Sequence, residues 1–369
     1  MKIYVITRHS IINHGSILQA YATQKFFENL GYKCEIIDYV NSFEKFPNYA
    51  KSLLNINEKW NKDFIHRLIY KLVKYPSYYK GYFKFKKYRK KLLILTNEIN
   101  SIEDLNRLDF KDAILCSGSD QLWGPLSNGS FDDAYFLNFG EKTPKFAYSS
   151  SVGRKVEFDD RIKGYLSAFN FITTREKTST NYIKSFYSKE IATIYDPTLM
   201  LKNEFWEDFI SNYKLNGEYI LVYKIHDNPE FDLFIKKFSK EKKLKIRRII
   251  NSYEELLLSG KSEFLVSPHR FLALIKNAKY VLTDSFHCTQ FSIIFNKNFL
   301  VFSPGVTNVR INDFLSDLNL QYRIIDNHES DSTIIDEQID YNIINKKIND
   351  NREIYTKYIY QNLNKIKRN

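Results

Sequence analysis

Runs of apolar residues alternate with helical apolar patterns along most of this chain of 369 residues. Residues 2–6 form a short strand-like run, and apolar positions at helical spacing follow from residue 17 to residue 27. Gly31 is placed to end that helix at its C′ position, and residues 34–39 form a second strand-like run. This order of strand, turn, helix and strand is typical of the start of a Rossmann-like unit.

The alternation then continues in two successive sets, which predicts two parallel-sheet domains of an α/β chain. Further strands are predicted at residues 113–116, 146–149, 171–174, 191–195, 219–223, 245–250, 263–266, 280–283 and 299–302. Further helices are predicted at residues 229–240, 269–277 and 339–367.

We therefore expect two Rossmann-like domains that face a cleft. The N-terminal domain is predicted at residues 1–205, with a basic helical insertion at about 42–95. The C-terminal domain is predicted at residues 206–335, and a C-terminal helical tail at residues 336–369.

One turn between a strand and a helix carries the strongest chemical signal. The strand-like run Tyr280 to Leu282 stops at a polar turn, and apolar positions at helical spacing follow from Phe291 onward. His287 stands at the start of that helix. In an open α/β sheet, ligands bind outside the carboxyl ends of strands, where helix N-termini favour anions. A histidine that only caps local backbone is the competing interpretation.

Several other segments occur with this turn in a fixed order along the chain. They are Asn13 to Ala22, Ile114 to Pro125, Tyr135 to Phe139, Lys145 to Gly153, Thr174 to Lys177 and Tyr195 to Leu199. Taken together, they resemble the polysaccharide pyruvyl transferase family from about residue 3 to about residue 320.

The resemblance implies a GT-B-like fold and a reaction. Members of this family move pyruvate from phosphoenolpyruvate onto two hydroxyls of one sugar, which forms a cyclic ketal and releases phosphate. Phosphoenolpyruvate would be the donor substrate, and no cofactor or metal is expected, because no metal-ligand spacing is visible. The acceptor would be a sugar or a lipid-linked oligosaccharide of a cell-surface polysaccharide.

The resemblance also assigns candidate residues. His287 matches the family histidine and is the predicted acid–base group. Many relatives carry an arginine where this chain has Ser285, so one cation is missing. Arg310 is a candidate replacement, and Arg175 matches the arginine of a strand-end Arg-Glu pair. For Arg175 the competing interpretation is an ion pair with Glu176 or another neighbour.

The remaining candidates each have a structural alternative. Asp120 is predicted to orient the acceptor hydroxyls, and Gly118 to approach the substrate, but their segment equally fits a turn with a helix cap. Asn13 and Gly15 are predicted to approach a ligand, or else only to begin a helix. Asp284 is a further candidate for orienting the imidazole of His287.

Charge adds one more expectation. The formal net charge is +12, and residues 60–91 contain eleven basic residues and one acid, Asp63, with aromatic residues between them. A solvated helical face, an anionic membrane surface and nucleic acid are the three interpretations. No nucleic-acid motif accompanies the segment, so nucleic acid is not expected as a partner.

The setting that the sequence favours is the cytoplasm, with peripheral attachment to the inner face of the membrane. The three cysteines form no Cys-x-x-Cys pair, and no apolar run approaches the roughly 20 residues that span a bilayer. Two other functions stay open at this point: a GT-B-type glycosyltransferase that uses a nucleotide sugar, and a non-catalytic family member that only binds glycan.

Overall fold

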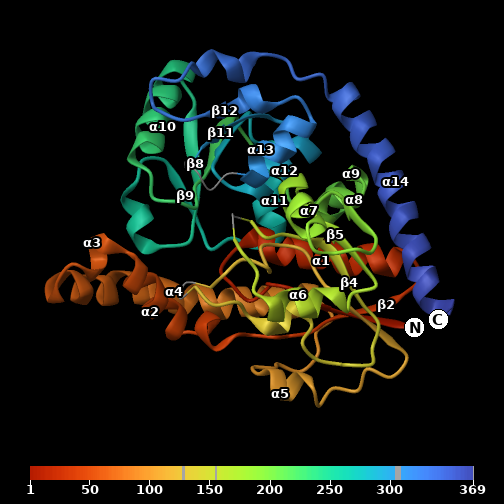
Figure 1. Cartoon of the computed structure of the whole chain (residues 1–369). Coiled ribbons are helices and arrows are strands. Elements are labelled where there is room, and N and C mark those ends of the chain that lie inside the picture. Colours follow the sequence, from red (N-terminus) through yellow and green to blue (C-terminus); the bar gives the residue numbers. More distant parts are fainter. Residues whose placement is uncertain (127–128, 154–155, 304–308, 369) are drawn as a thin grey trace. The chain divides into compact units, whose positions relative to one another are not determined.

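The computed structural model describes residues 1–126, 129–153, 156–303 and 309–368, and these residues form two compact units. The first unit contains Met1–Arg67, Phe85–Leu201 and Asn349–Asn369. The second unit contains Leu68–Lys84 and Lys202–Ile348. Each unit is built around one six-stranded parallel sheet, with helices between the strands (Figure 1).

The sheet of the first unit contains all of the strands predicted before residue 200. Its spatial order is β2 (Lys33–Ile36), β1 (Lys2–Ile6), β3 (Ala113–Ser117), β4 (Lys145–Ser150), β5 (Phe171–Thr174) and β6 (Ile191–Thr193). The chain leaves β1 for β2 on one side and returns to β3 on the other. The carboxyl end of β1 is therefore a topological switch point, where open α/β sheets bind ligands.

Helices connect these strands, and the first of them begins where the sequence predicted. Asn13 is the N-cap of α1 (His14–Asn29), and its side chain accepts a hydrogen bond from the amide of Gly15. Short helices follow the later strands: α5 (Ile102–Leu105), α6 (Asp160–Ser167), α7 (Lys177–Lys184) and α8 (Pro197–Met200). The predicted strand at residues 34–39 is shorter, because from residue 38 the chain bonds to residues 96–99 and no longer to β1.

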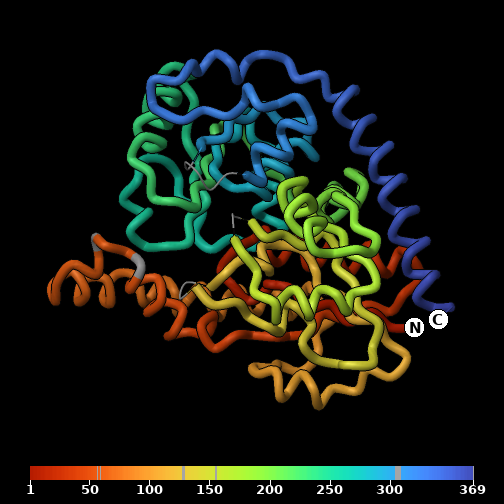
Figure 2. Tube along the Cα trace, viewed as in Figure 1, coloured from red at the N-terminus to blue at the C-terminus, as the bar shows by residue number. Residues whose placement is uncertain are grey.

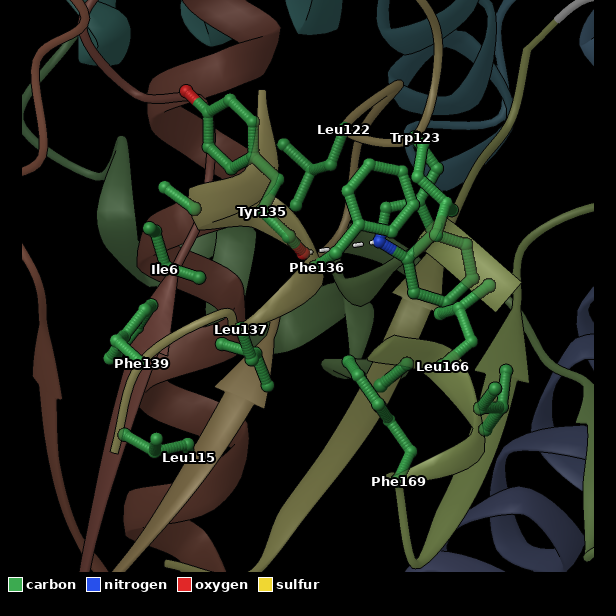
Figure 3. Packing of buried hydrophobic residues seen from close by; sticks show 14 of the residues in the cluster. Ile6, Leu115, Leu122, Trp123, Tyr135, Phe136, Leu137, Phe139, Leu166 and Phe169 are labelled. Carbon is green, nitrogen blue, oxygen red and sulfur yellow. Dashed lines mark hydrogen bonds between the residues drawn. The ribbon is translucent and has the colours of Figure 1, made fainter. Parts of the chain in front are cut away.

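One core of this unit packs large aromatic side chains against the sheet (Figure 3). The ring of Trp123 stacks on Phe136 and meets Phe169 edge-on, and all three side chains are buried. The indole Nε1 of Trp123 donates to the carbonyl of Tyr135 at 3.2 Å. Because its polar atom is satisfied, Trp123 can contribute its full apolar area to the core.

The second unit repeats the arrangement. Its sheet has the order β12 (Ile324–Ile325), β11 (Asn298–Phe302), β10 (Tyr280–Thr283), β7 (Tyr219–Tyr223), β8 (Lys245–Ile250) and β9 (Lys261–Phe264). The chain runs from β7 to β8 and β9, then returns to β10 beside β7. The switch point of this sheet therefore lies between β7 and β10.

The main helices of the second unit follow these strands directly. They are α9 (Asn203–Phe209), α10 (Pro229–Lys242), α11 (Pro268–Asn277), α12 (Phe286–Ile294) and α13 (Val309–Asp317). The core here is lined by Phe231, Phe234, Leu282 and Leu300, which are all buried between helix and sheet. The apolar runs of the sequence are long and uninterrupted in β7 and β10, because parallel strands are covered on both faces.

Two long helices complete the chain. The predicted basic insertion is helical: η1 (Ser42–Glu44), α2 (Asn48–Ile56) and α3 (Glu58–Asn61) precede α4 (Phe64–Leu92). The predicted tail is α14 (Tyr341–Arg368), the last segment of the tube in Figure 2. Its Arg352 donates to the carbonyl of Leu199, and its Ile359 and Leu363 are buried.

Candidate active site

The strand-to-helix turn after β10 holds His287 at the switch point of the second sheet. Ser285 is the N-cap of α12, and its Oγ accepts a hydrogen bond from the amide of Cys288. The amide of Ser285 donates to Thr283 Oγ1, whose hydroxyl donates to the carbonyl of Tyr223 on β7. His287 thus lies in the first turn of a capped helix, with 5% of its surface exposed.

Asp284 fixes this turn to the neighbouring loop after β7. Its carboxylate accepts hydrogen bonds from the amides of Ile225 and His226, at 2.7 and 2.9 Å. It also lies 3.1 Å from Nδ1 of His226. These contacts join the two loops on either side of the switch point. They give Asp284 a positioning role for the loop, and its candidate role in orienting the imidazole of His287 stays a prediction.

Arg310 approaches the first turn of α12 at Phe286, the residue before His287. The guanidinium of Arg310 lies 5.3 Å from the ring centroid of Phe286, and that ring meets the imidazole of His287 edge-on. Arg310 comes from α13, which packs on the first turn of α12 through Phe286 and Phe314. The second unit therefore gathers a histidine, a helix N-terminus and an arginine at one strand end, an arrangement that suits an anion.

Cys288 contributes packing to this site. Its side chain is fully buried, and burial raises the pKa of its thiol to about 12. A thiol with such a pKa is protonated at neutral pH and is a poor nucleophile. The structure therefore gives Cys288 a packing role.

In the first unit, Arg175 stands at the end of β5 among carboxylates. Its Nη1 donates to Oδ2 of Asp196 at 2.8 Å, and its Nη2 lies 3.5 Å from Oδ1 of Asp120. Glu176 is 3.9 Å away. Burial lowers the pKa of Arg175, but the three carboxylates outweigh it, so the net shift is upward. The ion pair that the sequence left open is present, with Asp196 as the nearer partner.

Asp196 also caps a helix, besides pairing with Arg175. It is the N-cap of α8, where it accepts from the amide of Thr198 at 3.0 Å and from its hydroxyl at 2.7 Å. Pro197 follows at the first helical position, which suits its fixed φ. The Asp-Pro pair therefore begins α8.

Asp120 lies at the carboxyl end of β3 in a left-handed conformation, with φ of 85°. Its carboxylate accepts from the amide of Gln121 at 2.8 Å and from the hydroxyl of Ser16, on α1, at 3.1 Å. A non-glycine residue in this region is uncommon and costs conformational energy, so its surroundings must hold it there. The contacts to Arg175 and Ser16 do so.

The glycine at position 118 has a packing explanation. A Cβ on Gly118 would lie 2.9 Å from side-chain atoms of Thr7 and Val5 and 3.2 Å from the carbonyl of Ile6. The sequence-based assignment of Gly118 to substrate binding is thus not needed to explain a glycine here.

Asn13 and Gly15 take part in the start of α1, which was the structural alternative for both.

Sequence reasoning missed a polar cluster at the carboxyl end of β1. Buried His9 lies with Nδ1 2.8 Å from the carbonyl of Thr7 and Nε2 3.0 Å from Asp38. Arg89 of α4 lies 3.3 Å from the same Asp38. The signal that could have found His9 is its position directly after the first strand. All three interpretations of residues 60–91 placed their basic side chains on the surface. This is wrong for Arg89, whose side chain is buried.

A second cation of this cluster is more open. Arg8 donates from Nε to Glu44 at 2.6 Å, and the hydroxyl of Ser10 donates to the same carboxylate. The side chain of Arg8 retains 31% exposure. It is therefore a positive group at the switch point of the first sheet that still reaches solvent.

The described part of the chain contains neither a metal-binding cluster nor a membrane-spanning helix. Within residues 1–126, 129–153, 156–303 and 309–368, no group of three or more His, Cys, Asp or Glu side chains is arranged to hold a metal ion. Over the same residues, none of the helices has the length and apolar character needed to cross a bilayer.

Comparison with known families matches residues 13–305 to the family described as polysaccharide pyruvyl transferase. A search of curated proteins found no match. Among solved structures, the chain is similar to a putative UDP-N-acetylglucosamine 2-epimerase from Listeria monocytogenes, with 8% identity, a TM-score of 0.52, and coverage of 95% of this chain and 90% of that chain. A UDP-GlcNAc 2-epimerase from Neisseria meningitidis, bound to UDP-GlcNAc, has 10% identity, a TM-score of 0.47, and coverage of 95% and 100%.

Similarity at such low identity bears on the fold alone, and of these two structures the one from Listeria is close enough to carry that argument. With the two six-stranded parallel sheets, it confirms the prediction of two Rossmann-like domains of the GT-B-like kind. What those relatives bind says nothing direct about the ligand of this chain.

Proposed function

Because this chain belongs to the polysaccharide pyruvyl transferase family, we propose that it moves pyruvate from phosphoenolpyruvate onto two hydroxyls of a sugar in a cell-surface polysaccharide or its lipid-linked precursor. The observation that carries the proposal is the family match over residues 13–305, which includes the start of α1 and the carboxyl ends of β3, β5 and β10. The turn at His287 supports it, because it joins an acid–base group with an anion-favouring helix terminus.

The reaction sets its own requirements. A proton is added to the methylene carbon of the donor, which becomes the methyl group, while one sugar hydroxyl forms a bond to the central carbon and gives up its proton. The bond from that carbon to the phosphate oxygen then breaks, and the second hydroxyl adds in its place. Its proton leaves with the phosphate. The site therefore needs an acid–base group and cations for a carboxylate and a phosphate.

His287 is the proposed acid–base group. A neutral imidazole can take a proton from a hydroxyl, and its protonated form can return one to carbon. Arg310 is the proposed donor-binding cation, because it approaches the same helix turn through Phe286. Ser285 and the first amides of α12 are proposed to donate hydrogen bonds to the anion, in place of the arginine that many relatives carry.

The first unit supplies Asp120 as the proposed group that orients the acceptor hydroxyls. Its position depends on Arg175 and Ser16. For Arg175, a role in binding the donor stays a prediction, and its ion pairs with Asp196 and Asp120 support a positioning role instead. Asn13, Gly15 and Gly118 would act through the backbone at the same sheet edge.

The partners follow from this chemistry. The proposed donor is phosphoenolpyruvate and the proposed acceptor is a sugar or a lipid-linked oligosaccharide. An acceptor on a lipid carrier would place the enzyme at the inner face of a membrane, as a peripheral protein with a basic surface toward anionic lipid. Nucleic acid is not part of the proposal.

The test is a direct assay of ketal formation. The protein is incubated with phosphoenolpyruvate and a panel of short sugars, with released phosphate and the ketal methyl signal in NMR as the two readouts. His287→Ala should retain the fold and lose on the order of 10²- to 10⁴-fold in turnover, the usual contribution of an acid–base group. Near wild-type turnover of a folded His287→Ala variant would remove this residue from the mechanism. Sugar transfer from a UDP-sugar, with no turnover of phosphoenolpyruvate, would replace the proposal with a glycosyltransferase.

A further inference from the structure

Helix α4 carries its exposed apolar residues on its outer face, where a soluble helix normally carries polar ones. Phe64, Ile65, Leu68, Ile69, Leu72, Tyr79 and Phe83 are all between 42% and 78% exposed. The residues 65, 69, 72, 76, 79 and 83 recur every three or four positions, so they form one stripe along the helix. We name this stripe, with Phe64 and Leu68 beside it, the outer apolar stripe.

The opposite face of α4 is the one that packs. Tyr70, Ser77 and Phe85 recur every seven or eight positions and are at most 1% exposed. Lys74 on this side pairs with Glu254. The outer apolar stripe is therefore not the core side of the helix. Over five turns it presents aliphatic and aromatic side chains that the described chain leaves exposed.

Basic residues border the stripe on both sides. Lys71 lies on one side of it, and Lys84 and Lys87 lie on the other. The segment 60–91 contains one acid, Asp63, against its eleven basic residues. An apolar face with Lys and Arg at its borders is the pattern of a helix that lies in the interface of an anionic bilayer.

We propose that the outer apolar stripe of α4 docks on an anionic phospholipid surface, with its apolar side chains below the headgroups and its flanking cations among them. This inference deepens the proposed function by naming the surface on which the acceptor would be met. Vesicle binding is measured without donor or acceptor, so a failure of docking is distinguishable from a failure of transfer.

Charge argues against the other occupants of this face. A second copy of the chain would bring another strongly basic segment against the first, and like charges repel. Nucleic acid would use the cations but not the aliphatic side chains of Ile65, Leu68 and Leu72. An anionic bilayer is the partner that satisfies these aliphatic side chains and the basic borders together.

The docking variant replaces aliphatic side chains with a polar residue of similar helix propensity: Ile65→Gln, Leu68→Gln and Leu72→Gln together. Because these side chains are exposed, the melting temperature should stay unchanged. Co-sedimentation with vesicles of phosphatidylcholine and phosphatidylglycerol should weaken on the order of a hundredfold, since three apolar side chains no longer enter the interface. A second variant, Lys71→Gln with Lys84→Gln, should weaken it about fivefold for each charge.

The matched control removes equal apolar exposure from other helices. Leu233, Ile343 and Ile354 are 47%, 66% and 60% exposed, close to the 45%, 65% and 68% of Leu68, Ile65 and Leu72. Their triple replacement by Gln should leave vesicle binding at the wild-type level. Pure phosphatidylcholine vesicles should bind the wild type far less, and added salt should weaken binding to the anionic ones.

Three results would overturn the proposal. The first is a wild-type protein that does not co-sediment with anionic vesicles even at low salt. The docking variant could bind as well as the control variant does. The wild type could sediment as a dimer that the docking variant converts to monomer, which would make the stripe a contact between copies. If the stripe docks on lipid, turnover on a short soluble sugar should be the same for the wild type and the docking variant.

Discussion

Replacing Arg175 with Met distinguishes its two possible roles. The substitution removes the charge and keeps most of the side-chain volume. Asp196, Asp120 and Glu176 then face one another without their shared cation, and the side chains of Asp196 and Glu176 are 0% and 3% exposed. Their mutual repulsion cannot be relieved by water at those positions.

The expected cost follows from burial. Removing one partner of a buried ion pair typically costs about 3–5 kcal/mol, because it leaves uncompensated buried charge. Asp120 keeps 11% exposure, so its share is screened more than that of Asp196. We expect Arg175→Met to lower the free energy of unfolding by about 3 kcal/mol or more, with the loss shrinking at acid pH as the carboxylates are protonated.

The assay is urea-induced unfolding of both the variant and a matched control. Arg161→Met breaks the ion pair of Arg161 with Asp133, where the arginine side chain is 45% exposed, and should cost less than about 1 kcal/mol. Phosphoenolpyruvate titration of the folded variants provides the second readout. If Arg175→Met unfolds like the control and loses donor affinity instead, the positioning role is wrong and Arg175 is a donor ligand.

Three further predictions test single contacts. Arg310→Ala should weaken phosphoenolpyruvate binding by on the order of 1.5–3 kcal/mol, seen by calorimetric titration, while an unchanged affinity would place the donor's cation elsewhere. Gly118→Ala should destabilise the fold by about 1–3 kcal/mol in urea unfolding, because its new methyl overlaps Thr7 and Val5; a neutral effect would contradict the packing explanation. For Asp38, burial raises the pKa, but hydrogen bonding to His9 and the nearby Arg89 outweigh it and lower the pKa overall. Its stabilising contribution is present above the unfolded pKa of about 3.9 and is lost as pH falls through the lower folded value, so Asp38→Asn should be less stable than wild type at pH 7 and nearly equal to it in strong acid.

The strands and the chemistry at their ends were predictable from local pattern. Buried parallel strands such as β7 and β10 are continuous apolar runs, and polar turns mark where they stop. His287 could be located because its turn, cap and helix are contiguous in sequence. For the same reason Asn13 could be placed at the start of α1.

Contacts between distant segments were not predictable. Arg175 and Asp196 are 21 positions apart and come together only because β5 and β6 are neighbours in the sheet. Arg89 belongs to a basic run, yet it packs on Asp38, which follows another strand. Local sequence gives the charge of a residue but not its partner, which the topology supplies.

Which face of α4 is buried could likewise not be predicted from the sequence. Helical spacing identifies an apolar stripe, but the same spacing describes a helix that buries it. The buried Tyr70 and Phe85 show which side packs, and so leave the stripe on the outside. A basic segment was predicted, whereas the exposed apolar face had to come from the structure.

The central claim is that phosphoenolpyruvate is the donor, and donor-induced stabilisation tests it most directly. Ligand that binds only the native state at 100 times its dissociation constant adds about 2.7 kcal/mol of stability. The melting temperature should therefore rise with phosphoenolpyruvate concentration and stay constant with UDP-GlcNAc or a GDP-sugar. Stabilisation by a nucleotide sugar, with phosphoenolpyruvate inert, would contradict the account.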